Sequence, residues 1–76
     1  MKKLLILGGT FNDVSIVEEA KAMGIYTIVT DSHTDLNRSP AKRIADEYWT
    51  INWSDIPALE EKCRHERIDG VFAGYD

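Results

Sequence analysis

Hydrophobic and polar residues follow one another in blocks along the first thirty positions, and their spacing changes between strand-like and helix-like. The continuous apolar run Leu4–Leu7 is typical of a strand that is covered on both faces. Residues 14–23 place apolar side chains at helical spacing, and Gly24 stands where a helix commonly ends. Residues 25–30 are rich in β-branched types, which predicts a second strand.

The second half of the chain continues this alternation. Ser39-Pro40 is a helix-start signal, with Ser as N-cap and Pro in the first turn, and it predicts a short helix over 41–45. A third strand is expected over 47–51. Ser54 is expected to cap a last helix, and Asp69-Gly70 to turn the chain into a fourth strand. The apolar face expected for this last helix consists of Ile56, Leu59 and Cys63.

Strands and helices therefore alternate as β-α-β-α-β-α-β, which predicts a Rossmann-like α/β fold with a four-stranded parallel sheet and helices on both faces. Each crossover is expected to be right-handed. The expected strand order is 3-2-1-4, which is half of a doubly wound fold. Residues 1–76 are expected to form a single domain. Val71 and Phe72 in the fourth strand lack a following helix to cover them, which predicts a fragment of a larger protein and favours self-association.

Charge and composition narrow the class of protein. Nine Lys and Arg against thirteen Asp and Glu give a net charge of −4, which argues against a nucleic-acid partner. No apolar stretch approaches the ~20 residues that a membrane span needs. A single cysteine excludes a disulfide framework. These features together predict a cytoplasmic protein that does not associate with membranes.

Ligands of such sheets bind beyond the carboxyl ends of the strands, where neighbouring connections diverge to opposite faces. For the order 3-2-1-4 this point lies between the first and fourth strands, which present Gly8-Gly9-Thr10 and Gly74-Tyr75-Asp76. Asp31 ends the second strand beside them. Two glycines either bring backbone amides close to an anion or only make the strand-to-helix turn. Asp31 likewise either contacts a ligand or caps its own loop.

A dinucleotide-binding loop would read G-x-G-x-x-G. From Gly8 this chain reads GGTFND, so Thr10 and Asp13 stand where the second and third glycines belong. Asp31 lies where a ribose-binding acid would, but one acid does not replace two glycines. An NAD-binding fragment of an oxidoreductase or epimerase is therefore kept as an alternative, beside a non-catalytic packing or dimerisation domain.

The other reactive side chains follow no spacing that is typical of a catalytic site. His33 lies near Asp31 and Asp35, but their spacing alone does not indicate a metal site. Cys63 is expected to lie in the core, and Trp49, Trp53 and Tyr48 are expected to be packing groups and not a stacking platform. No pattern unites a nucleophile, a base and an orienting group, so no catalytic residue and no metal ligand is predicted.

The order of three segments, KKLLILGGT, TDSHTDLNRSPAKRIADEYWTI and IDGVFAGYD, resembles the N-terminal (pre-ATP-grasp) domain of ATP-grasp carboxylate–amine ligases. This family includes the large subunit of carbamoyl-phosphate synthase, biotin carboxylase and the glycinamide ribonucleotide synthetases. The resemblance covers essentially the whole chain. In one departure, several members carry an acid or a further glycine where Thr10-Phe11 stand here, which leaves the acceptor substrate open.

The resemblance implies a domain that binds substrate without catalysing a reaction by itself. Family members join a carboxylate to an amine through an acyl phosphate made from ATP. ATP and Mg²⁺ belong to their later domains, so this chain is expected to hold no cofactor and to be inactive alone. Its implied partners are a small-molecule acceptor and the ATP-grasp domains of the same protein, with a homo-oligomer also open. The predicted substrate-binding residues are Gly8, Gly9, Thr10, Asp31, Tyr75 and Asp76.

Overall fold

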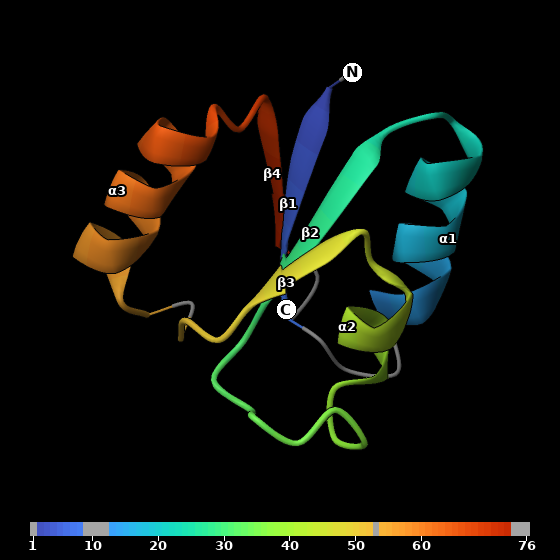
Figure 1. Cartoon of the computed structure of the whole chain (residues 1–76), viewed down its shortest axis with the longest axis horizontal. Helices are drawn as coiled ribbons and strands as arrows, with labels where there is room; N and C mark the ends of the chain where they lie inside the picture. Colours follow the sequence, from blue (N-terminus) through green and yellow to red (C-terminus); the bar gives the residue numbers. More distant parts are fainter. Residues whose placement is uncertain (1, 9–12, 53, 74–76) are drawn as a thin grey trace.

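The computed structural model describes residues 2–8, 13–52 and 54–73. Seven elements follow one another in this part of the chain, and they alternate as predicted (Figure 1). They are β1 (Lys3–Leu7), α1 (Val14–Ala22), β2 (Tyr26–Thr30), α2 (Pro40–Ile44), β3 (Glu47–Trp49), α3 (Ile56–Glu66) and β4 (Gly70–Ala73).

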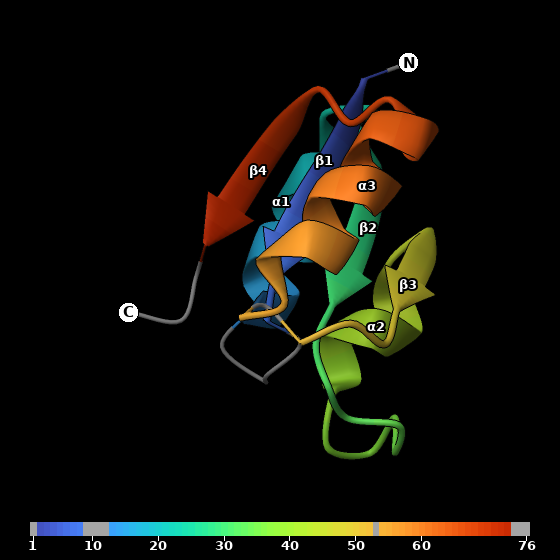
Figure 2. The same cartoon turned by 90° about the vertical axis from the view of Figure 1, so that its left-hand side faces the viewer.

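The strands form a single parallel sheet in the order β3-β2-β1-β4, which confirms the predicted topology. β1 lies level with β2, so that Leu5 pairs with Ile28, and level with β4, so that Leu5 pairs with Val71. Figure 2 shows β4 at one side of the sheet and β3 at the other. Because all strands run in the same direction, their carboxyl ends gather at one end of the sheet.

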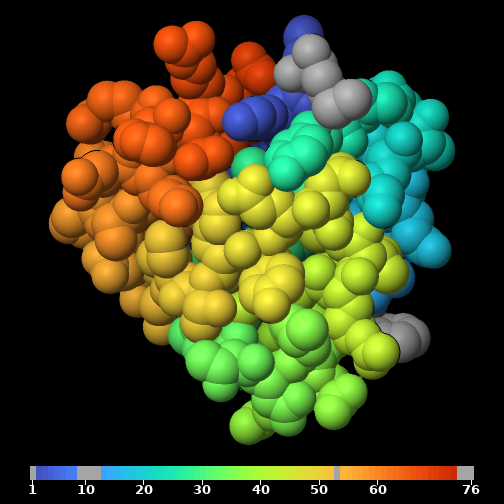
Figure 3. Space-filling view, in the orientation of Figure 1, coloured from blue at the N-terminus to red at the C-terminus, as the bar shows by residue number. Residues whose placement is uncertain are grey.

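Helices cover both faces of the sheet, and each face has its own buried cluster. Ile6, Val17, Val29 and Ala41 are fully buried on the side of α1 and α2. Leu5, Ile28, Trp49 and Leu59 are buried on the side of α3. Neighbouring residues of β1 and β2 belong to different clusters because successive side chains of a strand point to opposite faces. The segment that contains β3 crosses the middle of the surface between α3 and α1 (Figure 3).

Three local predictions about the last helix and its exit need correction. The N-cap of α3 is Asp55, not Ser54, whose amide and hydroxyl both donate to Asn52 Oδ1 instead. The chain leaves α3 through Arg67, which adopts a left-handed conformation with φ of 57°. Asp69-Gly70 therefore makes no separate turn, and Gly70 already belongs to β4.

The apolar face of α3 is only partly buried. Leu59 is buried and Cys63 packs against the same cluster, as predicted. Ile56, however, is 53% exposed, because it borders a groove beside β4. Val71 and Phe72 of β4 are 58% and 38% exposed, which confirms that this strand carries uncovered apolar side chains. Among the described residues, no helix is long and apolar enough to cross a membrane.

Candidate functional site

The carboxyl ends of β1 and β4 lie side by side, as the switch-point prediction requires. Leu7, the last residue of β1, is level with Ala73, the last residue of β4. The helices that flank this pair lie on opposite faces, with α1 following β1 and α3 preceding β4. Four of the predicted site residues, Gly9, Thr10, Tyr75 and Asp76, lie outside the described residues, so the strands that lead to them are placed but their own contacts are not.

Gly8 continues the sheet by one residue beyond β1 and then redirects the chain. Its amide donates to the carbonyl of Thr30 at 2.9 Å, and its φ of +116° is a conformation that L side chains rarely adopt. A Cβ atom at this position would lie 3.1 Å from Oδ2 of Asp13. Asp13 is buried at the start of α1, so its carboxylate and the Gly8 backbone are packed together. The positive φ of Gly8 fits the turn reading, but the rest of the Gly8-Gly9 loop lies outside the described residues, so both the turn and the contact with an anion stay predictions.

The second predicted contributor, Asp31, follows β2 and is held by several groups. Its Oδ1 accepts the His33 amide at 2.9 Å and forms an ion pair with Lys42 Nζ at 2.7 Å. Its Oδ2 accepts the Ser39 hydroxyl at 2.6 Å. The alternative that Asp31 hydrogen-bonds its own loop is therefore confirmed, whereas its contact with a substrate stays a prediction. Ser39 is the N-cap residue of α2 as predicted, but its hydroxyl bonds Asp31 and not the helix.

Lys42 is a site residue that the sequence reading missed. Its side chain is fully buried, and besides Asp31 its Nζ donates to the His33 carbonyl at 2.6 Å and lies 5.5 Å from the Tyr48 ring centroid. The sequence offered a weak signal, because a strand-ending Asp is followed eleven positions later by a Lys in the middle of a short helix. We call Asp31, Ser39 and Lys42 the β2 anchor.

The contacts within the β2 anchor keep the carboxyl group of Asp31 ionised. Burial alone would raise the pKa of Asp31, but hydrogen bonds from Lys42, Ser39 and the His33 amide stabilise the carboxylate more strongly. The pKa of Asp31 is therefore held below its usual value. The acid is charged at neutral pH, and its charge is balanced by Lys42 inside the protein.

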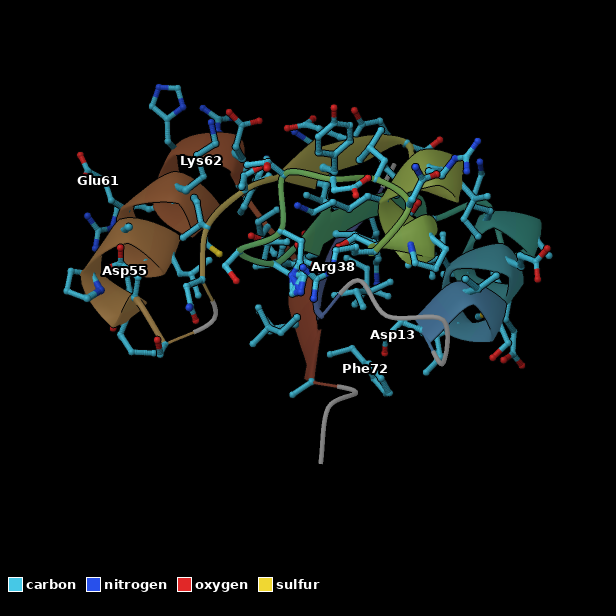
Figure 4. The ribbon with its side chains drawn as sticks, turned by 90° about the horizontal axis from the view of Figure 1, so that it is seen from below. Asp13, Arg38, Asp55, Glu61, Lys62 and Phe72 are labelled. Atoms are coloured by element: carbon cyan, nitrogen blue, oxygen red, sulfur yellow. The ribbon has the colours of Figure 1, made fainter. Side chains whose placement is uncertain are left out.

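The loop that the β2 anchor holds extends over the carboxyl end of the sheet. A shallow hollow of about 370 Å³ lies on it, lined by Ser32, His33, Thr34, Asp35 and Arg38. Figure 4 looks onto this end of the sheet, and Arg38 of the loop before α2, Asp13 at the start of α1 and Phe72 of β4 lie around it. No group of metal-ligating side chains forms among the described residues, which includes His33 and its acidic neighbours.

The end of β2 is also tied to the segment after β3. The Thr30 hydroxyl donates to the Ile51 carbonyl at 2.8 Å and accepts the Ile51 amide at 3.2 Å. Because this side chain replaces a backbone ladder, β3 ends at Trp49 and does not reach residue 51 as predicted. The end of β2 and the segment after β3 are therefore held together beside the candidate site.

The reactive side chains of the described residues suit packing better than catalysis. Ser39 is fully buried, so its hydroxyl is not a nucleophile for a ligand. Burial raises the pKa of the Cys63 thiol, which keeps it protonated. Trp49 is buried as predicted, whereas Tyr48 is about half exposed, and Trp53 lies outside the described residues. The arrangement can hold and orient a ligand, with no nucleophile and base brought together in the part described.

Comparison with known proteins identifies relatives in sequence. No protein-family model matches the chain. The chain is 42% identical over 72 residues to a formate-dependent phosphoribosylglycinamide formyltransferase of Sulfolobus acidocaldarius. That match covers 95% of this chain and 17% of the relative, so the chain spans about a sixth of the relative's length.

Solved structures share the fold. N5-carboxyaminoimidazole ribonucleotide synthetase from Thermotoga maritima superposes with a TM-score of 0.81 at 34% identity, covering 97% of this chain and 19% of the synthetase. N5-carboxyaminoimidazole synthetase from Staphylococcus aureus, solved in complex with ADP, matches with a TM-score of 0.81 over 97% of this chain and 18% of its own. At 22% identity this second likeness shows the fold alone. Sequence and fold together thus show that the chain is similar to the pre-ATP-grasp domain found at the N-terminus of ATP-grasp ligases.

Proposed function

We propose that this chain is the acceptor-binding domain of an ATP-grasp ligase that joins a carboxylate to an amine through an acyl phosphate. The observation that carries the proposal is the 34% identity and TM-score of 0.81 to a ribonucleotide synthetase over nearly the whole chain. ATP and Mg²⁺ would bind to other domains of the ligase, in line with the ADP present in one relative. The residues of this chain would bring no bond-making group and would instead contribute proximity and orientation.

The names of the relatives suggest the class of acceptor. Phosphoribosylglycinamide and carboxyaminoimidazole ribonucleotide both contain a phosphorylated ribose that carries a nitrogen substituent. We therefore favour a phosphoribosyl amine as acceptor over a specific likeness to the large subunit of carbamoyl-phosphate synthase. The acceptor would lie at the carboxyl ends of β1 and β4, with the Gly8-Gly9-Thr10 loop on one side and Tyr75 and Asp76 on the other.

A binding experiment on the chain itself tests where an acceptor lies. Phosphoribosylglycinamide is titrated into ¹⁵N-labelled protein, and amide chemical shifts are followed. We expect saturable changes at Gly8, in the loop 31–39 and after Ala73, with little change at the opposite end of the sheet. NADH serves as the comparison, because saturation by NADH alone would favour the oxidoreductase alternative and reject the ligase assignment.

A chimeric enzyme tests the catalytic part of the proposal. The segment of the Sulfolobus acidocaldarius formyltransferase that matches this chain is replaced by residues 1–76, and formate-dependent turnover is measured. Transfer of ¹⁸O from labelled formate to inorganic phosphate reports the acyl phosphate, because cleavage of that anhydride by the amine leaves one carboxylate oxygen on phosphate. A folded chimera that binds ATP but does not convert the acceptor would contradict an acceptor-binding role for this domain.

A further inference from the structure

The loop between β2 and α2 is held from within by a buried cation. The side chain of Lys42 is fully buried, and its Nζ donates to the carbonyl of Asp31 at 3.3 Å and to the carbonyl of His33 at 2.6 Å. Both carbonyls therefore point into the protein. The His33 amide is also used internally, because it donates to Oδ1 of Asp31.

The amides of Ser32 and Thr34 point away from this cation. In a trans peptide the C=O group and the N–H group of the next residue point in opposite directions, and no described peptide bond is cis. Because the carbonyls of Asp31 and His33 point at Lys42, the amides that follow them point the other way. In the described part of the chain neither amide donates a hydrogen bond to a protein group. Two backbone donors are therefore available on the outer side of the loop.

These two residues line the shallow hollow of the loop together with Arg38. Ser32, Thr34 and Arg38 are all exposed, so the two hydroxyls and the guanidinium accompany the two amides at the surface. The amide of Arg38 donates to the Asp35 carbonyl at 3.0 Å, and this turn brings Arg38 back beside the start of the loop. No ion pair among the described residues involves Arg38, and Figure 4 shows it over the carboxyl end of the sheet.

The charges on the hollow favour one class of anion. Asp35 also lines the hollow, and its carboxylate offsets the charge of Arg38. A ligand with a single negative charge, such as a carboxylate, gains little from such a pair. A phosphate monoester carries about −1.5 to −2 charges at pH 7 and three acceptor oxygens. It therefore has enough oxygens for two amides and a guanidinium at once, and enough charge to outweigh Asp35.

We propose that the loop 32–38 is a binding site for a phosphate monoester, whose oxygens accept hydrogen bonds from the Ser32 and Thr34 amides and from the Arg38 guanidinium. Lys42 does not touch this ligand and acts as a positioning residue, because its hold on the two carbonyls turns the amides outward. The site would stand without the ligase function. Its phosphate belongs either to the acceptor or to a second phosphorylated ligand.

Amide chemical shifts of the ¹⁵N-labelled chain test the site directly. Inorganic phosphate and ribose 5-phosphate are each titrated at constant ionic strength, with sodium chloride and ribose as controls. We expect both phosphates to move the amide protons of Ser32 and Thr34 downfield and to saturate in the millimolar range. Chloride and ribose are expected to cause no such shift. The absence of a saturable phosphate-dependent shift at these two amides would overturn the proposal.

Two variants of the exposed loop test which groups bind the phosphate. Arg38→Gln is expected to weaken phosphate binding about tenfold, whereas Arg64→Gln makes the same change of charge on α3 and should leave it unchanged. Asp35→Asn removes the opposing charge, keeps a side-chain oxygen for the Asn37 amide and is expected to tighten binding several-fold. Weaker binding by Asp35→Asn, or unchanged binding by Arg38→Gln, would contradict the proposal. If circular dichroism shows that a variant is unfolded, the titration of the unmodified chain decides.

A competition experiment identifies the source of the phosphate. Phosphoribosylglycinamide is added to the chain after saturation with inorganic phosphate. If the acceptor brings its own phosphate to the loop, the Ser32 and Thr34 amides move to new shifts as inorganic phosphate is displaced. If a second ligand brings it, Gly8 responds to the acceptor while the two loop amides keep their phosphate-bound shifts. Both results support the site. An acceptor that does not bind at all contradicts the ligase function and leaves the phosphate shifts in place, so the two ideas can fail separately.

Discussion

The ion pair between Lys42 and Asp31 offers the sharpest test of how this domain is built. Replacing Lys42 with Met keeps most of the side-chain volume but removes the ammonium group. Asp31, whose side chain is 12% exposed, then retains its charge without a cation, and the His33 carbonyl loses its 2.6 Å donor. The variant therefore measures the cost of leaving the buried carboxylate uncompensated together with the loss of the hydrogen bond to the His33 carbonyl.

The expected cost is a large part of the total stability. Removing one partner of a buried ion pair typically lowers the free energy of unfolding by about 3–5 kcal/mol. A domain of this length is expected to have a free energy of unfolding of about 4–11 kcal/mol, from roughly 0.05–0.15 kcal/mol per residue. We therefore expect Lys42→Met to unfold with much less denaturant. The double variant Asp31→Asn/Lys42→Met removes both charges and is expected to recover most of the loss.

Urea unfolding followed by Trp fluorescence measures these differences, because Trp49 is buried in the native state. In the wild-type protein the lowered pKa of Asp31 means that its stabilising effect is present above pH 3.8 and is lost as the pH falls through the folded value. In Lys42→Met, protonation instead removes the uncompensated charge, so the difference between variant and wild type should shrink in acid. A cost below about 1 kcal/mol at pH 7, or a double variant as unstable as the sum of the singles, would refute this reasoning.

Three further predictions concern the rest of the domain. Gly8→Ala should lower the free energy of unfolding by about 1–3 kcal/mol, because it strains the backbone and crowds the Asp13 carboxylate, as urea unfolding would show. Leu59→Ala should lower the free energy of unfolding by about 2–3 kcal/mol, which is near the low end for a buried leucine because Leu59 borders an open groove. The control Glu61→Ala, at an exposed position of the same helix, should change it by less than about 0.5 kcal/mol. Hydrogen bonds from the Thr27 amide and hydroxyl lower the pKa of Asp46. The stability that the Asp46 carboxylate contributes should therefore be present above pH 3.8 and be lost as the pH falls below that value, which urea unfolding at a series of pH values would show. Asp46→Asn should reduce that loss.

The fold could be predicted from the sequence because its signals are local. Apolar runs, helical stripes and the Ser39-Pro40 and Gly24 signals mark each element within a few residues, and the alternation of elements then restricts the topology. Where a distant side chain competes with a local signal, the predicted element was right but its cap hydrogen bond or its end was wrong. Ser39 holds the cap position, but Asp31 takes its hydroxyl, and the Thr30 hydroxyl shortens β3 by binding Ile51.

The site was predictable only in outline. The strand ends that form it follow from the order of the sheet, and Leu7 and Ala73 do lie level. The burial of Lys42 depends on Asp31 and the loop carbonyls coming together in space, and the spacing between Asp31 and Lys42 alone does not show that they meet. Sequence reasoning treats a lysine as a solvated residue by default, since lysine is almost never fully buried without a partner.

The unequal cover of the two sheet faces has a consequence for how the domain responds to stress and to insertion. On the α1 and α2 side the four residues of the buried cluster are fully buried, whereas on the other side α3 leaves an apolar groove beside β4. Local opening should therefore begin with α3 and leave the opposite layer intact, and native-state exchange would divide the domain into an early and a late unit. New structural units can be added on the α3 side during evolution without disturbing the strand ends that the opposite layer supports.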